Sequence, residues 1–183
     1  MAKKPTELRA SFIRFIEAQH MFFVATAAPT GRVNLSPKGM DSLKVLSPGR
    51  LVWLNLSGSG NETAAHILES DRMTLMFCAF EGMAKIIRVY GQAKTIHPRD
   101  DAWEELAGLF PAMAGARQIF DLTIDLVQVS CGTGVPLFDY QGQRGPEELE
   151  PFYAKMGPDR VMVYWRRKNQ TSVDGRPTGI FDD

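Results

Sequence analysis

A segment rich in glycine and serine, between an apolar strand pattern and a helix pattern, is the part of the chain best suited to bind an anion. Residues 51–54 are apolar, residues 55–60 contain two glycines and two serines, and a helix pattern begins at Asn61. The first N–H groups of a helix have no partner inside the helix, so the loop that leads into it can hold an anionic group. The same pattern is also typical of an ordinary turn. The surrounding residues therefore decide between the two interpretations.

A polar strand face upstream supplies a cation and further hydrogen-bond donors. Val33 and Leu35 alternate with polar residues, which predicts one apolar and one polar face. The residue before a proline favours extended backbone, so Ser36 and Lys38 can point to the same side of the sheet across Pro37. A lysine ammonium is a compact charge suited to phosphate. The alternative is a solvated surface lysine.

Alternation of apolar and polar residues along the chain predicts a mainly β protein, a small antiparallel barrel with added helices. The predicted strands, of which the third is the weakest, cover residues 21–26, 32–36, 43–46, 50–56, 73–80, 85–95 and 120–130. The predicted helices cover residues 6–19, 61–70, 99–110 and 146–156. Short turns join most strands, and the strand–helix alternation of a parallel sheet is missing. Gly91, inside a long strand, predicts a bulge or bend.

The C-terminal part is predicted to be a helical extension of a single domain that spans residues 1–183. The extension covers about residues 146–168, but residues 159–168 have the β-propensity of a strand and a length that also suits a helix. The polar tail, residues 169–183, is predicted to be either disordered or laid across a partner.

Composition and charge exclude some classes of function. The 183 residues are 44% hydrophobic and 23% charged, and 21 basic side chains balance 21 acidic ones. No overall basic excess favours nucleic acid or an anionic membrane. No apolar run approaches the ~20 residues of a membrane span, and no apolar signal-peptide core follows the first residues. We therefore expect a cytoplasmic protein.

Cysteine and histidine spacing gives no support for a metal site. Cys78 and Cys131 do not form a Cys-x-x-Cys pair, and reduced thiols are expected. Cys131 lies in a glycine-containing loop and is interpreted as a buried structural thiol. The three histidines show no ligand spacing, so no metal is predicted.

Three segments together are typical of a known group. They are Arg32–Gly39, Gly58–His66 and Arg88–Ala93, and with the order of elements they resemble the FMN-binding split-barrel proteins related to pyridoxamine 5′-phosphate oxidase. The resemblance implies an antiparallel six-stranded split β-barrel with flanking helices, and a homodimer with FMN at the subunit interface. It implies that the FMN phosphate lies near Lys38, with further contacts from residues 57–63.

The chain departs from the oxidase pattern at three places. The basic pair at the start of the helix is replaced by Thr63 and Ala64, the glutamine expected near the flavin ring is replaced by Ile86, and the C-terminal Arg-x-His is replaced by residues 166–171. These departures argue against true pyridoxamine 5′-phosphate oxidase activity. We expect an FMN-binding oxidoreductase that acts on a small unidentified substrate. The alternative is a carrier that binds flavin, deazaflavin or haem without turnover.

The predicted cofactor-binding residues combine the polar strand face, the glycine loop and two further cations. They are Asn34, Ser36, Lys38, Gly39, Asn55, Ser57, Gly58, Ser59, Asn61, Thr63, Lys85 and Arg88. Lys85 and Arg88 are candidates because a cation near flavin N1 favours the reduced ring; cross-strand ion pairing is the alternative. The basic run Arg166–Lys168 is interpreted as a solvated helix face, with a cover over the partner's phosphate as the alternative. No catalytic residue is nominated, because the redox chemistry belongs to the cofactor.

Overall fold

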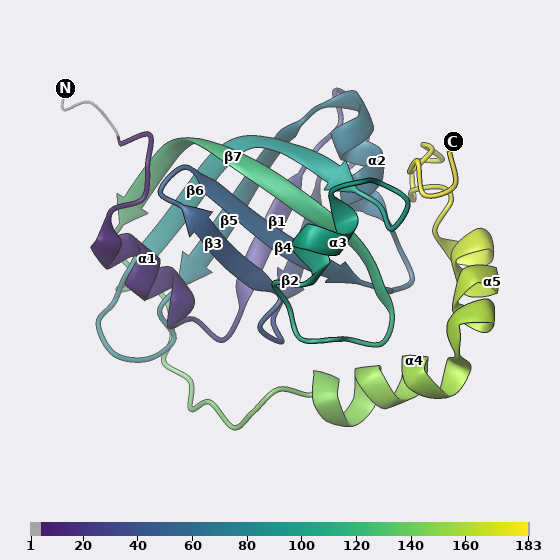
Figure 1. The fold of residues 1–183 in the computed structure, drawn as a ribbon. Helices are drawn as coiled ribbons and strands as arrows, with labels where there is room; N and C mark the ends of the chain where they lie inside the picture. Colours follow the sequence, from purple (N-terminus) through teal and green to yellow (C-terminus); the bar gives the residue numbers. More distant parts are fainter. Residues whose placement is uncertain (1–4, 183) are drawn as a thin grey trace.

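Seven antiparallel strands form one strongly curled sheet in the computed structural model, which describes residues 5–182 (Figure 1). The strands are β1 (Phe22–Thr26), β2 (Asn34–Lys38), β3 (Leu43–Ser47), β4 (Arg50–Leu56), β5 (Arg72–Cys78), β6 (Ile86–Ile96) and β7 (Ala116–Ser130). Their order in the sheet is β2-β1-β5-β6-β7-β4-β3. The predicted antiparallel barrel is confirmed, with seven strands in place of six because the weak third strand pairs with β4.

Helices flank the sheet and continue it at the C-terminus. They are α1 (Ala10–Glu17), α2 (Glu62–Glu69), α3 (Trp103–Ala107), the π-helical turn η1 (Gly145–Leu149), α4 (Glu150–Met156) and α5 (Pro158–Lys168). The ambiguous segment 159–168 is helical, since Pro158 occupies its first position and basic residues end it, as the helix dipole favours.

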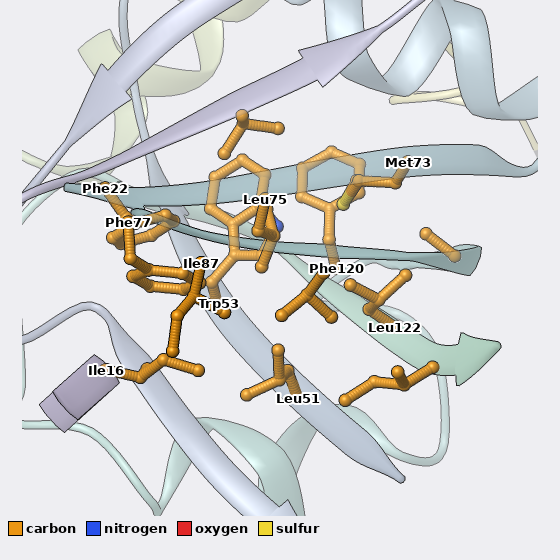
Figure 2. Packing of buried hydrophobic residues seen from close by; sticks show 14 of the residues in the cluster. Ile16, Phe22, Leu51, Trp53, Met73, Leu75, Phe77, Ile87, Phe120 and Leu122 are labelled. Carbon is orange, nitrogen blue, oxygen red and sulfur yellow. The ribbon is translucent and has the colours of Figure 1, made fainter. Parts of the chain in front are cut away.

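The main core lies inside the curl of the sheet (Figure 2). Trp53 of β4 stacks on Phe120 of β7 with ring centroids 4.6 Å apart, and Phe22 stacks on Phe77 at 5.8 Å. Ile16 of α1 packs into the same cluster. The helix predicted near the N-terminus thus packs on the barrel, although it is shorter than expected.

Strand β4 is buried on both faces, which keeps its C-terminal end in place. Val52 and Leu54 point away from the main core and pack with Ile119 of β7 against Leu106 and Phe110 at α3. An apolar cover on the outer face explains why residues 51–54 are continuously apolar. The loop that follows β4 therefore starts from a strand end that is held rigidly by packing on both faces.

The bulge predicted at Gly91 is confirmed. The pairing of β6 with β7 shifts register between Tyr90 and Gly91. A β-carbon at Gly91 would collide with the backbone carbonyl of Thr123 on β7. Only glycine allows the two backbones to approach this closely.

Residues 169–182, which we call the C-terminal arm, fold back onto the same chain beside α2 (Figure 1). Asp174 pairs with Arg32 in the β1–β2 connection, and Arg176 pairs with Glu69 of α2. The alternative of a disordered tail is therefore wrong, because ion pairs within the chain hold the arm. Within residues 5–182, no helix combines the length and apolar character needed to cross a bilayer.

Candidate anion and cofactor site

A cavity of about 400 Å³ lies where β2, the end of β4 and the start of α2 meet. Most of the residues nominated from the sequence line it. These are Asn34, Ser36, Lys38, Gly39, Asn55, Ser57, Gly58, Asn61 and Thr63. Segments separated by some twenty positions therefore contribute to one cavity.

Sheet topology explains why these segments meet. Strand β2 forms one edge of the sheet and β3 forms the other. The β3–β4 pairing begins at Leu43 and Trp53, so the last residues of β4 extend beyond β3 and face β2. Residues 34, 36 and 38 point toward the cavity, as the alternation predicted. The apolar face of β2 points outward, and Val33 and Leu35 are 73% and 64% exposed.

Lys38 places a partly buried ammonium in the cavity wall. Its Nζ lies 3.3 Å from Asn55 Oδ1 and 5.3 Å from the centre of the Trp53 ring. Burial, together with the nearby charge of Arg117, lowers the pKa of the Lys38 ammonium from 10.5 to about 8. The side chain therefore stays mainly charged at pH 7.

Arg117 supplies a second cation that the sequence did not reveal. It is only 2% exposed, its Nη1 donates to the carbonyl of Gly60 at 3.0 Å, and its buried Nε has no partner among residues 5–182. Burial lowers the pKa of the guanidinium to about 10. The cavity is therefore lined by two cations, Lys38 and Arg117.

A β-bulge directs Arg117 into the cavity. Asn55 pairs with Gln118 and Leu56 pairs with Ala116, so Arg117 is the extra residue on β7. The sequence prediction began this strand at residue 120 and left Arg117 in irregular chain. The sequence signal that could have pointed to Arg117 was the pair of polar residues directly before an apolar strand pattern.

Side-chain amides fix the geometry of the cavity wall. Asn55 Nδ2 donates to Gln118 Oε1 at 3.3 Å, while its Oδ1 accepts from Lys38. Asn34 Nδ2 donates to Thr63 Oγ1 at 3.2 Å, which connects β2 to α2. Asn34 and Asn55 are thus each hydrogen-bonded to residues of other elements.

The start of α2 differs from the usual capped helix. Asn61 occupies the N-cap position, but its side chain makes no capping hydrogen bond. It donates instead to the backbone carbonyl of Asn169 at 3.3 Å, and its buried Oδ1 has no partner. The carboxylate of Glu62, which also lines the cavity, accepts from the Val173 N–H at 3.0 and 3.1 Å. Asn61 therefore stands at the N-cap position of α2 without capping the helix through its side chain.

Three nominated residues lie outside the cavity. Ser59 is exposed on the loop. The Lys85 ammonium lies 5.1 Å from the ring centre of Phe15, and Arg88 Nη1 donates to Ser130 Oγ at 3.0 Å. Neither Lys85 nor Arg88 is among the described residues that line the cavity.

Other predictions concern the remaining surface. Cys131 is exposed, so the buried-thiol interpretation is wrong, and its thiol lies 2.9 Å from Thr133 Oγ1. The basic run that ends α5 is exposed, as expected for a solvated helix face, and Arg166 lies over the ring of Phe181 at 4.5 Å. Among the described residues, no group of three His, Cys, Asp or Glu side chains could hold a metal ion.

Sequence comparison identifies the family. The family model described as pyridoxamine 5′-phosphate oxidase matches residues 8–131. The chain belongs to the pyridoxamine 5′-phosphate oxidase family. A relative from Aspergillus flavus, the pyridoxamine 5′-phosphate oxidase family protein ustO, is 34% identical over 176 residues, which cover 87% of this chain and 70% of that protein. The family match ends before α4, α5 and the C-terminal arm.

Solved structures share the fold. A pyridoxamine 5′-phosphate oxidase homologue from Lactobacillus delbrueckii superposes with a TM-score of 0.54 at 20% identity, over 69% of this chain and 99% of that chain. HupZ from Group A Streptococcus superposes with a TM-score of 0.53 at 15% identity, over 67% of this chain and 98% of that chain. At these identities the likeness supports the split-barrel fold alone.

Proposed function

We propose that the cavity binds the phosphate of FMN and that the protein is an FMN-dependent oxidoreductase. The observation that carries this proposal is the pair formed by Lys38 and Arg117. Both cations line one cavity, and neither forms a salt bridge within residues 5–182. A buried charge without an opposite charge beside it lowers the stability of the fold. A phosphate monoester with close to two negative charges would compensate both.

The neutral donors around the two cations match the remaining phosphate oxygens. Ser36 offers a hydroxyl group in the cavity wall, and the uncapped first turn of α2 offers backbone N–H groups. A charge-assisted hydrogen bond contributes about 1.5–3 kcal/mol. The loss of Lys38 is therefore expected to weaken FMN binding about tenfold or more.

The apolar part of the cavity suits a flat ring. Met40, Leu54 and Leu149 line the same cavity as the two cations. Bound FMN would supply the electron-transfer chemistry, while the chain binds and orients the cofactor. The substrate is proposed to be a small molecule. We further propose that the working unit is the homodimer that the family resemblance implies.

The second candidate is a carrier without turnover. Haem is the less favoured occupant, because haem iron takes His, Cys, Tyr or Met ligands and the described lining residues include only Met40 from this set. Flavin and deazaflavin carriers fit the same cavity. Pyridoxamine 5′-phosphate oxidase activity itself is not proposed, since Thr63 and Ala64 replace the basic pair expected from the family.

Binding of FMN and of riboflavin, which lacks the phosphate, tests the proposal. We expect wild-type protein to bind FMN more than tenfold more tightly than riboflavin, as measured by flavin fluorescence quenching. Lys38→Ala should lower the affinity for FMN about tenfold and leave that for riboflavin unchanged. Lys94→Ala is the matched control, because Lys94 is exposed on β6.

Each outcome has a separate meaning. Equal affinity for FMN and riboflavin in the wild type would show that the cavity is not a phosphate site. A released chromophore with the spectrum of haem would favour the alternative cofactor. Flavin that binds with phosphate selectivity but is not reduced by NADH or NADPH would support the carrier.

A further inference from the structure

The loop between β4 and α2 is held from outside by residues near the C-terminus. We call residues 57–61 the cavity loop. Trp165 Nε1 donates to Ser57 Oγ at 2.7 Å, and Asn169 Nδ2 donates to the Gly58 carbonyl at 2.9 Å. The backbone carbonyl of Asn169 accepts from Asn61 Nδ2. Three points of a five-residue loop are therefore fixed by the end of α5.

These contacts are buried and rigidly supported. Asn169 has no exposed surface. Thr178 Oγ1 donates to the Asn169 carbonyl at 2.6 Å, and the Thr178 N–H donates to the Gln170 carbonyl at 3.0 Å. Trp165 packs with Tyr153 in the core formed by α4, α5 and the arm. The hydrogen-bonding groups are thus held in place by the fold of the C-terminal arm.

Trp165 and Asn169 do not themselves line the cavity. Any effect that they have on an anion must therefore pass through the cavity loop. Ser57, which Trp165 contacts, also donates to the Gly115 carbonyl at 2.8 Å. The loop is consequently held between Gly115, just before β7, and α5, while one side of it faces the cavity.

The contact between Asn169 and Asn61 has a direct consequence for the start of α2. An asparagine at the N-cap normally satisfies an N–H group of the first turn. Here the Asn61 side chain is engaged by Asn169 and makes no capping bond. The first-turn N–H groups therefore remain available for an anion.

We propose that Asn169, assisted by Trp165, is a positioning residue that shapes the cavity loop and the start of α2 for a phosphate group. The inference rests on the proposed phosphate site and assigns a role to a part of the chain outside the family match. Replacing the Asn169 side chain would remove its hydrogen bond to the Gly58 carbonyl, while the backbone carbonyl at position 169 would still accept from Asn61. The cavity loop would then lose one of its three supports, and its geometry around the phosphate would loosen.

The competing explanation is that Asn169 and Trp165 serve stability alone. A general loss of stability would weaken the binding of FMN and riboflavin alike. A positioning role would weaken FMN alone, because riboflavin has no phosphate. The ratio of the two affinities therefore separates the explanations.

The experiment measures FMN and riboflavin affinity for Asn169→Ala and Trp165→Phe, with folding followed by circular dichroism. We expect each variant to bind FMN about three- to tenfold more weakly than wild type, with riboflavin affinity unchanged. Gln170→Ala is the control, because its side chain is exposed and donates to the Arg166 carbonyl near the end of α5. Trp165→Phe keeps an aromatic ring in the core and decides the question if Asn169→Ala does not fold.

An unchanged FMN-to-riboflavin ratio in the folded variants would overturn the positioning role while leaving the phosphate site intact. A wild-type protein without preference for FMN would instead contradict the proposed function, and the positioning role with it. The two failures are therefore distinguishable.

Discussion

The ammonium of Lys38 and the guanidinium of Arg117 line the same cavity, and each charge disfavours the other. The pKa of Lys38 in the folded chain lies near 8, below its ordinary value of 10.5. The charged ammonium therefore disfavours folding at pH 7, and this penalty fades as the pH rises from about 8 to 10.5. A bound phosphate would remove the penalty. Functional sites commonly retain such unfavourable charges because the ligand compensates them.

FMN affinity is accordingly expected to depend on pH. Above about pH 8 the Lys38 ammonium loses its proton, so affinity should fall by up to tenfold per pH unit until the higher pKa of the complex is reached. Below about pH 6 the phosphate itself loses its second charge, and affinity should fall again. Titrations from pH 5 to 9.5 would measure this, with riboflavin as the control without phosphate. A constant FMN dissociation constant between pH 7 and 9.5 would show that Lys38 does not contact the phosphate.

The bulge at Gly91 shows how one element sets the curl of the sheet. A β-carbon there would meet the Thr123 carbonyl at a distance that backbone atoms cannot accommodate without breaking the β6–β7 pairing. Gly91→Ala is expected to lower the free energy of unfolding by about 2–3 kcal/mol, measured by urea denaturation. Gly49→Ala is the control, because nothing lies within 4 Å of a β-carbon at that turn. Equal unfolding midpoints for the two variants would contradict the steric argument.

Elements differ in how far the sequence predicts them. The cavity residues on β2 and at the β4–α2 junction could be predicted from the sequence, because each belongs to a short local pattern. One pattern is an alternating strand, and the other is a strand that leads into a helix through glycines. The place of Arg117 in the cavity could not be predicted from the sequence, because a bulge is defined by pairing between β7 and a strand sixty positions earlier. Lys85 and Arg88 do not line this cavity, and their place near the flavin ring stays a prediction.

At the C-terminus, local propensity and tertiary structure disagree. The Val-, Tyr- and Trp-containing segment 161–165 has β-propensity, yet it forms α5 because packing of Val161 and Trp165 against Tyr153 and Ile180 requires a helical face. The ion pairs of Asp174 and Arg176 could not be foreseen, because their partners lie more than a hundred positions earlier. The polar composition of the arm was therefore misleading about its order.

At the scale of the whole molecule, the outward face of β2 calls for an explanation. Val33 and Leu35 are largely exposed on an edge strand that forms one wall of the cavity. Exposed apolar side chains on an edge strand favour pairing with another chain. The net charge of zero offers no overall repulsion against such association. A second copy of this chain is the occupant that the family resemblance implies.

We therefore expect light scattering to give twice the chain mass of 20.4 kDa. Leu35→Lys should shift the protein toward monomer, because it places a charge within the proposed interface. Leu109→Lys is the matched control, since Leu109 is also exposed but lies just after α3. If the partner completes the cofactor site, the Leu35→Lys monomer should also bind FMN more weakly than the control variant. A wild-type monomer that binds FMN fully would contradict the interface and confine the cofactor to one chain.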